Sequence, residues 1–253
     1  MSMVGWLNLL SGAGMIAVGA IAIYAWRKRA GIEYFLFGAV FWAAAIAVKV
    51  ALDLTVTPQL NGLLPYPLVS SVILMGLYFG LRTGVFESGI PYVTARLAKL
   101  APGFDQAVAI GIGAGAAEAF ILGAASMMNV TALILVPGLI DSYPSATQAA
   151  LELQFSLPFI PLPIWERLFT LFCHVFAMVL AMYALRAGWK WLCLSIAFMA
   201  LLDGALIPLL VYVTTKTYAG NLIIEAFVGA MGIASIVGLY IMRGIYERQV
   251  SQA

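Results

Sequence analysis

The chain contains seven apolar runs, each about as long as a helix that crosses a lipid bilayer. They cover residues 5–26, 34–55, 66–90, 105–128, 164–186, 190–213 and 220–242. Backbone polar groups in lipid must be satisfied internally, so only helices or a closed barrel can span it. Barrel strands would be alternating segments of about ten residues, which these runs are not. The sequence predicts an all-α transmembrane bundle of seven spans, forming one integral membrane domain over residues 1–253.

Composition supports a membrane location and argues against other classes of protein. Hydrophobic residues make up 64% of the chain and charged residues only 9%, whereas soluble domains are about a quarter charged. The net charge of +2 gives no reason to expect nucleic acid as a partner. We therefore expect a multi-pass protein of the cell membrane, with the lipid bilayer as its main partner.

The basic residues predict the orientation of the chain. When connections are assigned alternately to the two sides, one side receives nine basic residues and the other only Lys216. The nine are Arg27, Lys28, Arg29, Arg96, Lys99, Arg186, Lys190, Arg243 and Arg248. Cytoplasmic loops carry such an excess, so we expect an outer N-terminus and a cytoplasmic C-terminus.

Three runs carry an ionisable residue far from their ends: Glu118, His174 and Asp203. At about 1.5 Å per helical residue, each lies roughly 15 to 20 Å inside the bilayer. A charge at that depth costs roughly 3 kcal/mol or more, so it must face protein, a cavity or a metal. Glu118 lies within the glycine-rich stretch Gly111–Gly123, whose small residues let a neighbouring helix approach closely. The three residues could hold a metal such as zinc, relay protons, or hydrogen-bond to one another and lock the helices.

Other charged residues have local partners within reach. Arg167 and His174 are seven residues apart and share a helix face, and Arg167 could form a structural ion pair with Glu166 or Glu225. Lys49 and Asp53, four apart, could pair with one another. Arg82 and Glu87 are expected near the cytoplasmic end of the third span, where snorkelling lowers the cost of charge.

The longest connection, residues 129–163, is expected on the outer side. It contains a predicted short helix from Ser145 to Leu153, capped by Ser145. The proline-rich stretch 156–165 is expected to lack a regular helix, and it could serve as a lid or as a simple connector.

Three sequence blocks resemble the YhfC family of polytopic membrane proteins. These are LRTGVFESGIPYVTAR (81–96), GIGAGAAEAFILG (111–123) and WERLFTLFCHV (165–175), with a weaker match in MALLDGALIP around Asp203. The blocks resemble a Phe-Glu-Glu-x-x-Arg-Tyr block, a Gly-x-Gly-His-Gly-Gly-x-Glu-Ala block and Glu-Arg followed by His. The family is grouped with type II CAAX prenyl proteases and the γ-secretase subunit APH-1. The resemblance implies an intramembrane metalloprotease.

The resemblance implies roles for particular residues. Glu118, His174 and Asp203 would hold the metal, with zinc as the candidate, and Glu87 or Glu118 would be the catalytic general base. Three positions depart from the pattern: Ser88 replaces the second Glu, Pro91 the Arg, and Ala114 the His. Each departure removes a ligand, a base or a charge partner.

Three functions are compatible with these residues. The first is an intramembrane metalloprotease acting on a peptide substrate, with the three departures pointing to catalytic degeneracy. The second is a non-catalytic scaffold or accessory subunit that binds a membrane protein partner. The third is a transporter of protons or a small solute that uses the midplane carboxylates.

Overall fold

The structure, a computed structural model, describes residues 4–64, 67–136, 138–213 and 215–250, and these contain helices but no strands. Seven helical stretches are long and apolar enough to cross a membrane, which confirms the predicted number of spans. They run over Trp6–Trp26, Ile32–Thr55, Val69–Leu97, Phe104–Leu135, Leu157–Ala187, Lys190–Tyr212 and Tyr218–Arg248.

The elements follow one another with short connections. The α-helices are α1 (Leu9–Trp26), α2 (Ile32–Thr55), α3 (Thr57–Leu63), α4 (Val69–Leu97), α5 (Phe104–Leu135), α6 (Ser145–Gln154), α7 (Pro161–Ala187), α8 (Lys190–Tyr212) and α9 (Tyr218–Val250). The short 3-10 helices η1 (Trp6–Asn8), η2 (Ile140–Ser142) and η3 (Leu157–Phe159) lie between them.

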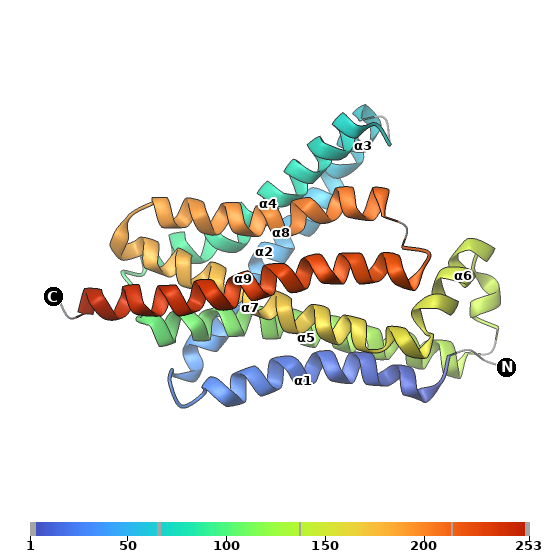
Figure 1. Ribbon diagram of the computed structural model, residues 1–253, viewed down its shortest axis with the longest axis horizontal. Coiled ribbons are helices and arrows are strands. Elements are labelled where there is room, and N and C mark those ends of the chain that lie inside the picture. The colour runs from blue at the N-terminus through green and yellow to red at the C-terminus, as the bar shows by residue number, and fades with distance from the viewer. Residues whose placement is uncertain (1–3, 65–66, 137, 214, 251–253) are drawn as a thin grey trace.

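The spans are arranged around α5 and α7, the two most buried helices of the set. Helices α1 and α2 pack on α5, α9 packs on α7, and α4 pairs with α8. Figure 1 shows the N- and C-termini at opposite ends of the bundle, as an odd number of spans requires. Which end faces the cytoplasm stays a prediction.

The glycine-rich stretch of α5 brings three helices into close contact. A Cβ atom on Gly111 would lie 2.4 Å from Cα of Val175 on α7, and one on Gly113 would lie 2.0 Å from the carbonyl oxygen of Phe35 on α2. Contacts this close require residues without side chains, as in small-residue helix interfaces. The sequence correctly predicted that these residues admit neighbouring helices.

Glycines also allow helices α4 and α8 to pack closely together. Gly76, Gly80 and Gly84 recur every four residues on one face of α4. A Cβ atom on Gly80 would lie 2.3 Å from the carbonyl oxygen of Ala200 on α8. This pairing holds the polar residues of α4 and α8 at a fixed distance from each other.

Two local predictions were wrong. The proline-rich stretch becomes helical from Pro161, because a proline in the first turn replaces an N–H group that has no helical partner anyway. Ser145 begins α6 but makes no capping hydrogen bond, since Pro144 occupies the N-cap position.

A third correction concerns the end of α4. This helix runs on to Leu97, so Glu87 lies well inside it and is buried rather than snorkelling at its end.

Candidate functional site

A polar centre lies where α2, α4, α5, α7 and α8 meet, and its middle is the contact between Glu118 and His174. Oε2 of Glu118 on α5 lies 2.8 Å from Nε2 of His174 on α7. Oε1 of Glu118 forms an ion pair of 2.8 Å with Nη1 of Arg167, which lies two turns before His174 on the same face of α7. The seven-residue spacing of Arg167 and His174 therefore lets one carboxylate contact both side chains, as their predicted shared face suggests.

On the other side of His174 lies Glu87 of α4, which is buried. Its Oε1 atom forms an ion pair with Nζ of Lys49 on α2. Its Oε2 atom lies 3.5 Å from Nδ1 of His174. The two predicted catalytic carboxylates, Glu87 and Glu118, thus contact opposite nitrogens of the same imidazole ring.

Asp203 reaches this centre indirectly. Its Oδ2 atom accepts a hydrogen bond from the hydroxyl of Thr83 on α4. Nζ of Lys49 lies 3.3 Å from the same hydroxyl oxygen and donates to it. The structure therefore brings Glu118 and His174 together, as predicted, and places Asp203 at the far end of a contact series through Thr83 and Lys49.

The contact between His174 and Glu87 has an unusual property: neither facing atom has a hydrogen-bond partner among the described residues. Both Oε2 of Glu87 and Nδ1 of His174 are buried. A carboxylate can only accept, so the nitrogen that contacts Glu118, Nε2, carries a hydrogen. The other nitrogen, Nδ1, faces Oε2 of Glu87 at a separation longer than an ordinary N–H···O hydrogen bond. Neither buried atom therefore has a hydrogen bond of ordinary length among the described residues.

The three departures from the family pattern have structural consequences. Oγ of Ser195 on α8 bonds to the carbonyl oxygen of Ala177 on α7 and lies 2.8 Å from Oγ of Ser88. Ser88 thus takes part in a contact that joins α4, α7 and α8. Pro91 lies inside α4, which continues through it.

Ala114 is fully buried where α2 packs on α5. A Cβ atom on Gly38 of α2 would lie 3.0 Å from the backbone nitrogen of Ala114. The close approach of α2 therefore depends on small residues at this level of α5.

The predicted outer ion pair is found in part. Arg167 pairs with Glu166, whereas Oε2 of Glu225 has no hydrogen-bond partner among the described residues. The predicted pair of Lys49 with Asp53 is wrong, because Asp53 pairs with Arg82 of α4.

Sequence reasoning missed Lys49 as a residue of the centre. A signal was present, since Lys49 continues the buried α2 stripe of Gly38, Trp42 and Ala45 at intervals of three or four residues.

Apolar helices enclosing buried charged side chains define a multi-pass membrane protein with an intramembrane polar centre. A family profile described as YhfC intramembrane metalloprotease matches residues 14–228, which include every residue of this centre. The chain belongs to the YhfC intramembrane metalloprotease family. No curated protein and no solved structure matches it.

The family name implies a metal, so we ask whether the side chains of the polar centre could bind one. A catalytic zinc takes three protein ligands and leaves one position open. The described residues contain no group of three or more His, Cys, Asp and Glu side chains that could hold a metal ion. Of the oxygens and nitrogens of Glu87, Glu118 and His174, Oε2 of Glu87 and Nδ1 of His174 are buried without hydrogen-bond partners among the described residues, and Lys49 and Arg167 already supply positive charge nearby. In this arrangement the residues do not fit a zinc ion.

Proposed function

We propose that this YhfC-family protein hydrolyses peptide bonds within the membrane, using a water molecule bound beside the contact of Glu87 and His174. One observation carries the proposal: Oε2 of Glu87 and Nδ1 of His174 face each other at 3.5 Å, both buried and both without partners. Buried polar atoms normally have partners. A water molecule would satisfy both and would lie beside a carboxylate able to take its proton.

Each residue then has a defined task in the reaction. Glu87 accepts a proton from water as general base, and the remaining oxygen attacks the peptide carbonyl carbon. The carbon–nitrogen bond breaks, and the proton held by Glu87 passes to the departing amine. His174 orients the water through Nδ1. Glu118 is a positioning residue, because it fixes the proton of His174 on Nε2.

Two cations support this arrangement. Lys49 holds Oε1 of Glu87, which leaves Oε2 directed at His174. Arg167 does the same for Glu118 by holding Oε1, while Oε2 contacts His174. A buried carboxylate without such a partner would be strongly destabilising, so both cations also keep the centre folded.

The test is peptide cleavage in proteoliposomes by the purified full chain. A mixture of synthetic single-span peptides is incubated in water enriched in oxygen-18, and mass spectrometry reads the new C-termini. Hydrolysis by water predicts one heavy oxygen in each new carboxylate. Glu152→Gln, a change at an exposed glutamate on α6, should leave the rate unchanged.

A non-catalytic accessory role is the second candidate, and the helix-joining contact of Ser88 with Ser195 favours it. If the wild-type protein yields no labelled termini but co-purifies with one membrane protein at fixed ratio, this role replaces hydrolysis. The metal ligation by Glu118, His174 and Asp203, and the transport of protons or solutes, stay predictions.

A further inference from the structure

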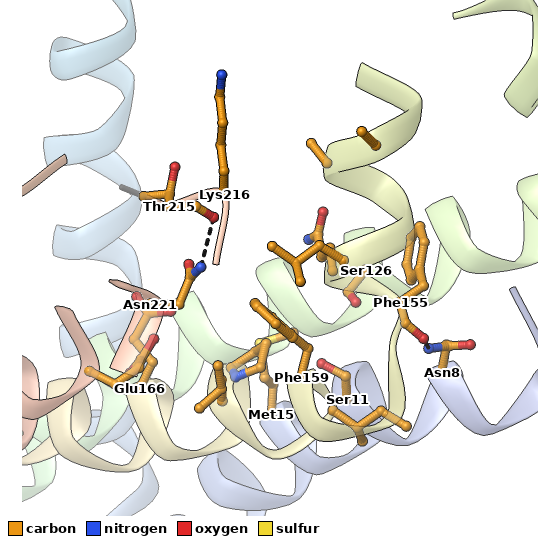
Figure 2. A pocket seen from close by; sticks show the side chains of 18 of the residues that line it. Asn8, Ser11, Met15, Ser126, Phe155, Phe159, Glu166, Thr215, Lys216 and Asn221 are labelled. Carbon is orange, nitrogen blue, oxygen red and sulfur yellow. Dashed lines mark hydrogen bonds between the residues drawn. The ribbon is translucent and has the colours of Figure 1, made fainter. Parts of the chain in front are cut away.

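A cavity of about 680 Å³ lies between the start of α1, α5, α6, the start of α7 and the start of α9 (Figure 2). Its volume is in the range of small-molecule sites. Helix α6 and the turn that follows it cover one side. This cover is fixed to α1, because Nδ2 of Asn8 donates a hydrogen bond of 2.7 Å to the carbonyl oxygen of Phe155. The cavity is therefore a built part of the fold and not a gap beneath a loose loop.

Apolar and polar side chains share the walls of the cavity. Met15, Leu153, Phe159 and Leu162 are among the residues that line it. The amide group of Asn221 is already engaged, since it donates to the carbonyl oxygens of Thr215 and Thr217. The apolar part of the lining suits the hydrocarbon portion of a ligand, and the polar part suits a polar head.

Two carboxylates lie in this mixed lining, Glu166 of α7 and Glu225 of α9. Glu166 is paired with Arg167. Glu225 differs, because its Oε2 atom is buried and has no hydrogen-bond partner among the described residues. The side chain of Lys216, which also lines the cavity, extends away from Glu166 in Figure 2.

The backbone of Glu225 is held at the cavity wall by the side chain of Trp165. Nε1 of Trp165 on α7 donates a hydrogen bond of 3.3 Å to the carbonyl oxygen of Glu225. The indole also packs against Gly229 one turn later, where a Cβ atom would lie 3.3 Å from Nε1. These contacts fix the backbone that carries the Glu225 carboxylate, and Oε2 of that carboxylate has no donor among the described residues.

We propose that this cavity binds the ammonium group of an amphiphilic ligand, with Glu225 as its counter-charge and the apolar walls around its hydrocarbon part. A buried carboxylate oxygen without a donor costs free energy, and an ammonium group supplies both donors and opposite charge. A bare metal ion fits less well, because the described residues offer no group of three or more ligands. The inference goes beyond the proposed hydrolysis and does not rest on it.

The ammonium group could come from a peptide amine or from an aminolipid headgroup. Both sources share the chemistry that Glu225 would recognise. The first probe is therefore a simple one, octylammonium, with 1-octanol as the uncharged match of the same chain length.

The experiment is calorimetric titration of the purified full chain in an uncharged maltoside detergent. We expect one octylammonium per chain, bound at least roughly tenfold more tightly than 1-octanol. Glu225→Gln should reduce octylammonium binding to the level of the alcohol, and the exposed Glu152→Gln should leave it unchanged. Ala149→Trp, which fills the cavity, should weaken both ligands, and thermal unfolding confirms that each variant is folded.

Competition then separates the sources of the amine. A short apolar peptide with a free N-terminus, compared with its acetylated form, tests the peptide source. Phosphatidylethanolamine, compared with phosphatidylglycerol, tests the lipid source. Equal binding of octylammonium and 1-octanol, or unchanged octylammonium binding by Glu225→Gln, would overturn the proposal. Because the readout is binding, failure of peptide cleavage would leave this result unaffected.

Discussion

Nε2 of His174 lies 2.8 Å from Oε2 of Glu118, and this contact joins the two most buried helices of the protein. It places a proton on Nε2, and the proposed reaction requires that Nδ1, which faces Glu87, be unprotonated. Because His174 is the single histidine of the chain, its ring can be observed without interference from others.

The first prediction concerns the tautomer of His174. Nitrogen-15 NMR of histidine-labelled protein at neutral pH should show a protonated Nε2 and an unprotonated Nδ1. Glu118→Gln should relax this preference, because an amide can donate as well as accept. A protonated Nδ1 in the wild-type protein would contradict the assignment on which the water position depends.

The second prediction concerns the close approach of α5 and α7. Gly111→Ala places a methyl group 2.4 Å from Cα of Val175, so the helices must separate, at a cost of about 1–3 kcal/mol. The matched control is Gly89→Ala on α4, where a Cβ atom meets nothing within 4 Å. Thermal unfolding in detergent should show a lower midpoint for Gly111→Ala only. Equal midpoints for the two variants would show that the contact is not tight.

The third prediction concerns the ion pair of Lys49 and Glu87. Lys49→Met leaves a buried carboxylate without its cation, which should reduce the free energy of unfolding by about 3–5 kcal/mol. Adding Glu87→Gln should restore part of that loss, because the uncompensated charge is then gone. Unfolding by denaturing detergent measures both, with Lys28→Met at an exposed position as control. A double variant no more stable than Lys49→Met would argue against the pairing.

The sequence predicted the seven spans because each needs only a bilayer-length run of apolar residues. It also predicted that Glu118 and His174 lie at a similar depth in the bilayer, because counting residues along each helix gives their distance from the membrane surface. It failed for Lys49, because Asp53 offered a partner one turn away while the actual partner, Glu87, lies on another helix. The hydrogen bond of Asp203 with Thr83 was not foreseen for a similar reason, because the neutral side chain of Thr83 gives no signal of charge pairing.

The proline-rich stretch shows a limit of another kind. Composition alone suggested that residues 156–165 could not form a regular helix. The helix can begin within this stretch because Pro161 lies at the very start of α7, where a proline breaks no helical hydrogen bond. Helix starts of this sort depend on a boundary of one or two residues, which sequence patterns do not fix.

We propose that Glu87 activates water beside His174 without help from a metal. The direct measurement is the rate of peptide cleavage in proteoliposomes for wild-type and Glu87→Gln protein, each before and after treatment with a strong chelator. Chelation should leave the wild-type rate unchanged, and Glu87→Gln should lower it by roughly 10²- to 10⁴-fold, with thermal unfolding showing that the variant is folded. Loss of wild-type cleavage on chelation with recovery on adding zinc, or a Glu87→Gln rate equal to that of the wild type, would contradict it.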